Sequence, residues 1–296
     1  MIDPVRLFHS GSVYTADAGG TWSEAIAVRG DRILDVGATA DLQARFPEAE
    51  SISFEGRTVV PGFIDAHNHY LATGEGLGSV NTRYPAVASP EDLVTAVRKA
   101  AAVTPPGEWI HGFGFDHGKF DRPPTRWDLD GATTEHPVAI RHVSGHYSLV
   151  NSRVLEAAGV DDTTPDPKGG AFVRDEHGRN TGLCMDAACE LVEPVAVDIG
   201  SHGPNFHVVA TLDDLVAAIE RAGEAYFAAG LTTVCDAQVT ERELAAYREA
   251  RRRDEWWLRV VCMPLSHQLD EYGSIGLAGP FGDDHLWLGP MKFYMD

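Results

Sequence analysis

Two histidines one residue apart, His67 and His69, are the side chains in this sequence best placed to do chemistry. They directly follow an apolar run at residues 58–66, which predicts a strand buried on both faces. Residues two apart on a strand point to the same face, so the two imidazoles would converge on one point. Imidazole is a preferred ligand of zinc and similar divalent ions. The pair predicts part of a metal site, and two ordinary polar residues after a strand are the alternative.

A lysine near the end of the sequence, Lys292, stands in an apolar segment at 286–294 that predicts a strand. A buried ammonium group without a partner is costly. One explanation is a side chain that reaches solvent at the strand end. The other is chemical modification, because an amine that takes up carbon dioxide becomes a carbamate, which can bridge two metal ions. The residues alone leave both explanations open.

A regular alternation of helices and apolar strands begins at residue 212. We predict helices at 213–229 and 241–253, and strands at 231–236, 258–265 and 286–294. Such alternation is typical of βα units around a parallel sheet. In a (β/α)8 barrel the carboxyl ends of the strands form the catalytic face, and both histidines would stand at such an end. Residues 58–296 would supply roughly four of the eight barrel strands.

Two segments lie outside that alternation. Residues 1–57 contain a predicted hairpin of strands 25–29 and 32–36 and one short helix at 41–46, which indicates a small β-rich domain. Residues 75–205 are too long for an ordinary βα loop and predict an insertion that covers the mouth of the site. The expected fold class is therefore α/β: a partial (β/α)8 TIM barrel with an N-terminal β-rich domain and an insertion.

The insertion should have its own secondary structure. We predict a helix at 90–102 with Ser89 as its N-cap, strands at 109–115 and 137–143, a helix at 151–158 and a loop at 161–170. Asp116 directly follows the first of these strands, which makes it a candidate to face a substrate pocket.

Residues 59–69, VVPGFIDAHNH, resemble the first-strand signature of the amidohydrolase superfamily. Further blocks occur in the order found in one branch, which contains N-substituted formamide deformylases and TIM-barrel metal-dependent hydrolases. They lie at 127–130, 137–138, 144–146, 150–152, 157–159, 169–170, 174–175, 178, 181–182 and 230–233. Each block is weak alone, but the combination is specific and covers nearly the whole chain.

The resemblance implies a metal site in which His67 and His69 are ligands, and it favours Lys292 as a bridging carbamate. The implied cofactor is a divalent metal, zinc, as one or two ions. A superfamily site usually also needs two histidines and an aspartate from later strands, and the sequence stops at Asp296 before they appear. We therefore assign no catalytic residue and expect a truncated chain.

The resemblance also suggests substrate-binding residues. In the resembled branch the positions of His146 and Asn151 face the site, and Asp116 joins them as a third candidate from its place after a strand. The alternatives are that His146 caps a turn after Gly145 and that Asn151 begins a helix.

The implied activity is metal-dependent hydrolysis of a non-peptide carbon–nitrogen bond, of amide or formamide type. Because the aspartate that would move the proton is not found, we expect weak or absent activity in this chain. One alternative is a non-catalytic fragment or scaffold paralogue with an incomplete metal site. Another keeps the metal but changes the reaction, to deamination or ring opening.

Charge and composition narrow the expected partners. The formal net charge of −20 disfavours binding to nucleic acid or to an anionic membrane. We expect a small-molecule substrate and leave a homo-oligomer open. Residues 1–10 show no secretory signal, and the apolar stretches are too short to span a bilayer. The four cysteines form no C-x-x-C pair, so we expect reduced, buried thiols in the cytoplasm.

Overall fold

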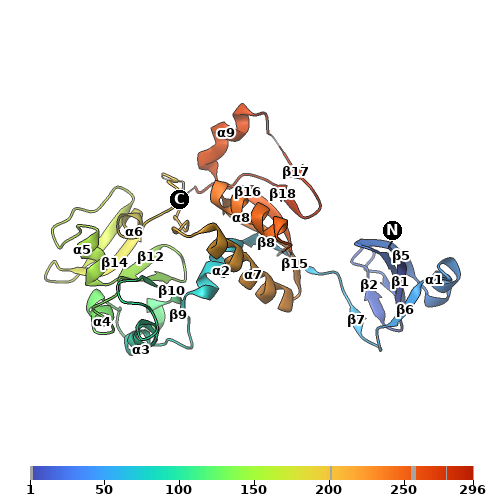
Figure 1. Ribbon diagram of the computed structural model, residues 1–296, viewed down its shortest axis with the longest axis horizontal. Helices are drawn as coiled ribbons and strands as arrows, with labels where there is room; N and C mark the ends of the chain where they lie inside the picture. Colours follow the sequence, from blue (N-terminus) through green and yellow to red (C-terminus); the bar gives the residue numbers. More distant parts are fainter. Residues whose placement is uncertain (1–2, 201, 255–257, 278, 296) are drawn as a thin grey trace. The chain divides into compact units, whose positions relative to one another are not determined.

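The computed structural model describes residues 3–200, 202–254, 258–277 and 279–295. The chain divides into two compact units, Met1–Phe63 and Ile64–Asp296, which Figure 1 draws in blue and in cyan to red. Each unit has hydrophobic clusters of its own.

The first unit consists of short strands and one short helix. Its elements are β1 (Val5–His9), β2 (Ser12–Tyr14), β3 (Trp22–Ser23), β4 (Ala25–Arg29), β5 (Arg32–Gly37), α1 (Thr39–Arg45), β6 (Glu50–Ser53) and β7 (Thr58–Val59). They form sheets of order β5-β4-β1-β6 and β3-β2-β7. The predicted hairpin is confirmed, because β4 and β5 pair antiparallel around Gly30 at φ +56°. The predicted helix at 41–46 corresponds to α1, which buries Leu42 against Leu7.

The apolar run at 58–66 is not one buried strand, so that prediction is wrong. The run divides at Pro61–Gly62: β7 pairs with β2, and the rest becomes β8 (Phe63–Asn68). Phe63 and Ile64 are 60% and 68% exposed. The physical reason is position, because β8 is the end strand of its sheet and its first side chains are largely uncovered by other described residues.

The βα part of the second unit follows the predicted rhythm. Its elements are α2 (Tyr70–Gly78), α7 (Leu212–Ala228), β15 (Leu231–Val239), α8 (Glu241–Arg252), β16 (Arg259–Pro264), η2 (Ser266–Gln268), α9 (Leu269–Ser274), β17 (Phe281–Gly282) and β18 (Leu286–Leu288). The sheet has the order β17-β18-β16-β15-β8, with β15–β16 and β16–β18 parallel. Helices α2, α7 and α8 cover it with a core that includes Leu71, Ile219, Val234 and Val260.

The strand predicted at 286–294 is shorter than expected. β18 ends at Leu288, and the backbone then runs irregularly until Lys292 forms an isolated parallel bridge with Leu265. A glycine and a proline, Gly289 and Pro290, separate the two pieces, and proline has no N–H for a ladder hydrogen bond.

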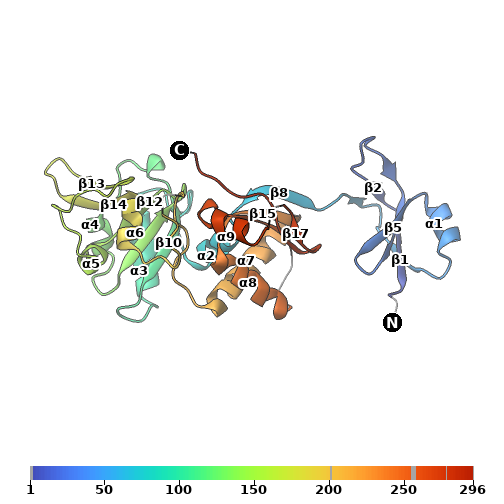
Figure 2. The same cartoon turned by 90° about the horizontal axis from the view of Figure 1, so that it is seen from above.

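The segment predicted as an insertion builds a sheet of order β13-β14-β12-β11-β10-β9 (Figure 2). Its strands are β9 (Val80–Asn81), β10 (Ile110–Phe115), β11 (Val138–His142), β12 (Tyr147–Val150), β13 (Gly170–Arg174) and β14 (Asn180–Asp186). Its helices are α3 (Pro90–Ala101), η1 (His117–Lys119), α4 (Arg126–Asp130), α5 (Ser152–Ala157) and α6 (Ala187–Val192). The predicted N-cap of α3 is confirmed, because the Ser89 hydroxyl accepts from the Asp92 N–H at 3.1 Å.

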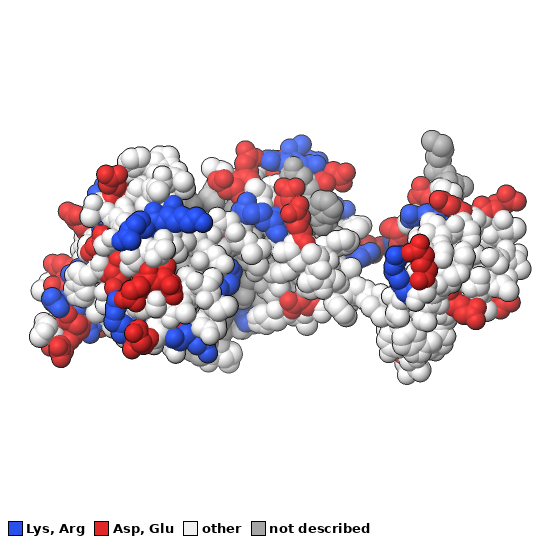
Figure 3. Space-filling model, turned by 90° about the horizontal axis from the view of Figure 1, so that it is seen from below, with Lys and Arg blue, Asp and Glu red and all other residues white. Residues whose placement is uncertain are grey.

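The structure shows where the charged side chains and the four cysteines lie. On the face drawn in Figure 3, acidic and basic side chains are interspersed. All four cysteines are free thiols; Cys184, Cys189 and Cys262 are buried, whereas Cys235 is half-buried. No helix in the described ranges combines the length and apolar character that a membrane crossing requires.

Two helical glycines offer a test of the packing between α2 and α7. A Cβ at Gly74 in α2 would lie 1.9 Å from the carbonyl oxygen of Ala218 in α7, whereas a Cβ at Gly273 in α9 would meet nothing within 4 Å. We expect Gly74→Ala to lower the free energy of unfolding by about 1–3 kcal/mol through overpacking. Gly273→Ala should be neutral or raise it by up to about 1 kcal/mol. Urea unfolding of both variants measures the difference, and equal stabilities would contradict this packing.

Candidate metal centre and its surroundings

The two histidines of the predicted metal site lie at the junction of β8 and α2. His67 is the penultimate residue of the strand, and His69 is the N-cap residue of the helix. Their ring centroids are 5.6 Å apart, with the ring planes at 75°. Asp65 orders this junction, because its carboxylate accepts from the His67 N–H at 3.1 Å and from the Asn68 amide at 2.8 Å. The rings are therefore neighbours; their sharing of one ion stays a prediction.

A backbone carbonyl fixes the orientation of His69. Its Nδ1 donates to the carbonyl oxygen of Ala237, in β15, at 3.0 Å, since a carbonyl can only accept. The His69 ring also packs against Phe206 in a T-shaped arrangement, with centroids 5.3 Å apart. A histidine whose Nδ1–H is held in this way presents Nε2 as the free donor atom, as in many metal sites.

Burial keeps His69 in the form that binds metals. Burial lowers the pKa of His69; the hydrogen bond to Ala237 opposes this, and the charges of His67, Lys292 and His207 add to the lowering. A neutral imidazole is the ligand form, since a protonated ring has no free lone pair.

Lys292 lies half-buried near the end of β16. Its backbone N–H donates to the Pro264 carbonyl at 2.8 Å, and its own carbonyl accepts from the Ser266 N–H at 3.0 Å. The ammonium group lies 4.4 Å from the centroid of the Tyr294 ring, a cation–π distance. The charge of Lys292 contributes to the lowered pKa of His69. The carbamate role of Lys292 stays a prediction.

The described ranges bring no three His, Cys, Asp or Glu side chains together in a group that could hold a metal ion. His207 lines the same small cavity as His69, but both of its ring nitrogens already have partners. Its Nδ1 meets Asn205 Oδ1 at 2.9 Å, and its Nε2 meets the Gln238 carbonyl at 3.2 Å and the Glu243 carboxylate at 3.4 Å. The donors present therefore fit part of a metal site, two imidazoles with one oriented Nε2, rather than a complete set.

A buried acid beneath the histidines was not foreseen from the sequence. Asp236 is 2% exposed; it accepts from the Tyr70 N–H at 3.0 Å and from the Tyr247 hydroxyl. Burial raises the pKa of Asp236 to about 7, although both hydrogen bonds act in the opposite direction. The available signal was an aspartate at the end of the predicted strand 231–236.

A buried cluster of charged side chains around Arg242 lines the same cavity as Asp236. Arg242 forms ion pairs with Glu75 and with Glu243, the latter at 2.7 Å. Burial would raise the pKa of Glu243, but His207 and Arg242 outweigh it and lower the pKa to about 2. With His69, Phe206 and Asp236, these residues line a small cavity of about 20 Å³.

Of the three predicted substrate-binding residues, Asn151 has a structural role in this fold. It is fully buried, and its side-chain oxygen accepts from the N–H groups of Val138 and Val154, both at 3.2 Å. Its amide donates to the His136 carbonyl at 2.9 Å. The structure thus favours the alternative, in which Asn151 begins a helix as the N-cap of α5.

His146 and Asp116 occupy different places. His146 Nδ1 meets Asp186 Oδ1 at 2.6 Å, and both line a cavity of about 540 Å³. Gly203, in the wall of that cavity, packs closely against Tyr294, the aromatic partner of Lys292. Asp116 instead caps η1 and lies 3.7 Å from His142 Nε2. The structure does not place these two candidates in one cavity, and their roles stay predictions.

Comparison with known proteins decides the family. The sequence pattern of the amidohydrolase family matches residues 50–296. This chain belongs to the amidohydrolase family. Residues 25–49 match the imidazolonepropionase-like composite domain of bacteria.

One protein of similar sequence and two solved structures of similar fold resemble this amidohydrolase-family chain. An N-substituted formamide deformylase of Arthrobacter pascens is 34% identical over 81% of this chain and 43% of that protein. An uncharacterized metal-dependent hydrolase from Pyrococcus furiosus has a TM-score of 0.69 and 25% identity, over 97% of this chain and 55% of its own. Its counterpart from Pyrococcus horikoshii shares the fold, with a TM-score of 0.70, 23% identity and coverage of 97% and 54%. The chain thus spans about half the length of these relatives.

In this amidohydrolase-family chain, substitution of Tyr247 tests whether the pKa of the buried Asp236 is raised. The pKa of Asp236 is raised from 3.8 to about 7, so the native state binds this proton more tightly and stability falls as pH rises through that window. Tyr247→Phe removes a hydrogen bond that favours the carboxylate. We expect it to cost about 1.5–3 kcal/mol at pH 8.5, where Asp236 is ionised, and about 0.5–1.5 kcal/mol at pH 5, where it is protonated.

Urea unfolding at the two pH values measures this difference. Tyr84→Phe is the control, because Tyr84 is 58% exposed and its loss should change stability by less than about 0.5 kcal/mol at either pH. A cost for Tyr247→Phe that is independent of pH would show that Asp236 does not titrate in this range.

Proposed function

We propose that this protein is a metal-dependent hydrolase of non-peptide carbon–nitrogen bonds, of amide or formamide type, with His67 and His69 as metal ligands. The observation that carries the proposal is the hydrogen bond from His69 Nδ1 to Ala237, which leaves Nε2 free beside a second imidazole. The carbon–nitrogen specificity is supported by the 34% identity to an N-substituted formamide deformylase.

We also propose that β8, β15, β16 and β18 are strands of a (β/α)8 barrel. The support is their shared sheet, the parallel pairing of β15 with β16 and of β16 with β18, and the helices that alternate with them. In such a barrel the catalytic groups stand at the carboxyl ends of the strands. His67 and Ala237 lie within the last three residues of β8 and β15, and Lys292 lies four residues after the end of β18.

A bound divalent metal, zinc in this proposal, would lower the pKa of a water molecule and polarise a carbonyl group. The chain's residues have separate tasks. Ala237 holds His69 in one tautomer, and Phe206 packs against its ring. Lys292 would join the ligands as a carbamate, and His146 and Asp116 would contact a small-molecule substrate from the insertion.

Metal binding by the purified chain tests the site. We expect zinc bound by the parent protein, measured by elemental analysis after dialysis, and a loss of zinc affinity of at least about tenfold in His67→Ala and His69→Ala. His177→Ala is the matched control, because its side chain is 67% exposed and far from either histidine in sequence. Lys292→Arg keeps the positive charge but cannot form a carbamate, so it should lower the zinc content if two ions are bound.

An assay of N-substituted formamide hydrolysis, in which released formate is measured, distinguishes an enzyme from a non-catalytic scaffold. Zinc-dependent release that is lost in His67→Ala supports the proposal. Zinc binding without hydrolysis supports the scaffold, and hydrolysis that survives His67→Ala overturns the assignment of the metal site.

A further inference from the structure

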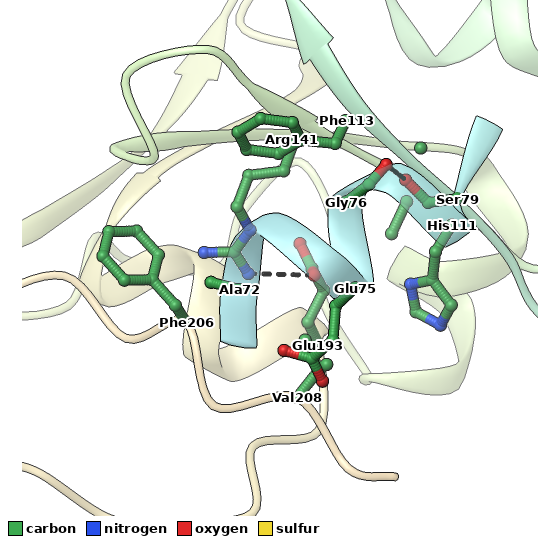
Figure 4. A pocket seen from close by; sticks show the side chains of 12 residues that line it. Ala72, Glu75, Gly76, Ser79, His111, Phe113, Arg141, Glu193, Phe206 and Val208 are labelled. Atoms are coloured by element: carbon green, nitrogen blue, oxygen red, sulfur yellow. Dashed lines mark hydrogen bonds and ion pairs between the residues drawn. The ribbon is translucent and has the colours of Figure 1, made fainter. Parts of the chain in front are cut away.

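A second cavity, of about 100 Å³, lies between α2 and the sheet of the insertion. Most of its lining is apolar: Ala72, Gly76, Gly112, Phe113, Ala139, Phe206 and Val208. The charged side chains in its wall are Glu75, Arg141 and Glu193, together with His111. Figure 4 shows these residues, with the Arg141–Glu193 ion pair as a dashed line.

One oxygen of Glu193 has no hydrogen-bond partner among the described residues. Glu193 is 4% exposed, and its Oε2 accepts from Arg141 at 3.0 Å. Its Oε1 is buried and receives no hydrogen bond from any residue that the structure describes. A buried carboxylate oxygen without a donor is unfavourable, and Glu193 lines this cavity, so a donor group bound in the cavity could supply the missing hydrogen bond.

The Arg141–Glu193 ion pair limits the kind of hydrogen-bond donor that suits Glu193 Oε1. Arg141 already balances the charge of Glu193, and its other nitrogen donates to the Asn205 carbonyl at 2.9 Å. Glu75, the other carboxylate in the wall, is paired with Arg242. Because both carboxylates already have a cationic partner, a neutral N–H donor fits better than a further cation. The cavity is larger than one water molecule requires. It therefore suits a small apolar group that carries one neutral N–H.

The cavity adjoins the candidate metal centre. Phe206 lines it and also packs against the His69 ring at 5.3 Å. Ala72 and Glu75 likewise line both this cavity and the small one that contains His69. A ligand seated against Glu193 would thus lie in the cavity that neighbours the one containing His69.

We propose that this cavity is a substrate subsite for the N–H-bearing, apolar part of a small secondary amide. Glu193 Oε1 accepts the amide N–H, and Arg141 is a positioning residue that holds the carboxylate. The choice of an amide rests on the proposed function, but the recognition itself needs no metal.

Two probes of the same shape test the acceptor. N-ethylformamide carries the N–H, and ethyl formate replaces it with an ether-type oxygen. We expect the amide to bind at least about tenfold more tightly than the ester, because an ester oxygen against a carboxylate leaves Oε1 unpaired. NMR titration of the purified chain with a chelator present gives both affinities without turnover.

Glu193→Gln changes the acceptor with little change in shape. The oxygen of the introduced side-chain amide must face Arg141, which puts its NH2 group where Oε1 was. The preference for the amide probe should fall to about threefold or less, or reverse. An unchanged preference in this variant overturns the role of Glu193.

Filling the cavity tests its location. Val208→Phe should weaken both probes at least about tenfold by occupying the space. Val103→Phe is the matched control, since Val103 is 84% exposed and lines neither this cavity nor the neighbouring one that contains Glu193. Equal binding of both probes, or no binding of either, by the parent protein overturns the proposal and leaves an ordered water as the partner of Oε1. His67→Ala should leave the probe preference unchanged, so a failed metal site is distinguishable from a failed subsite.

Discussion

The hydrogen bond between His69 and the Ala237 carbonyl is the contact on which the candidate site depends. It joins the start of α2 to β15 across 168 residues of sequence. Asp236, one residue earlier on β15, accepts the backbone N–H of Tyr70 and so fixes the next residue of the same helix. Two successive residues of α2 are thereby tied to two successive residues of β15. The bond to Ala237 sets the direction in which the His69 ring points, and the bond from Tyr70 to Asp236 holds the start of the helix in place.

The polar groups beneath the site are arranged so that each buried charge meets an opposite one. Arg242 lies between Glu75 and Glu243, and the latter also meets His207. Asp236 is the exception, since uncharged donors surround it and burial raises its pKa to about 7. Buried pairs of this kind add little net stability but are costly to break on one side. They therefore act more to define one arrangement around His69 than to stabilise the fold.

Local signals in the sequence predicted local structure. Ser89 before α3, Gly30 between β4 and β5, and the alternation after residue 212 each act within a few residues. The first two predictions were confirmed, and the alternation was confirmed except that its last strand ends at Leu288. The burial of the run at 58–66 was wrong, because burial depends on what packs over β8 and not on the run itself. The partners of His69 could not be predicted either, since the pairing with Ala237 depends on which strands become neighbours. The Arg141–Glu193 pair, 52 residues apart, likewise carries no local signal.

The segment predicted as an insertion contains an ion pair that links its sheet to its last helix. Arg141 projects from β11, and Glu193 directly follows α6, so the ion pair closes the insertion sheet against its own last helix. The same pair faces α2, whose N-cap is His69. One helix therefore carries a candidate metal ligand at its start and the wall of a ligand-sized cavity along its next two turns. Because α2 is held at its start by β15, the position of the cavity relative to His69 is set by the same helix, which is the fixed spacing that the proposed subsite would need.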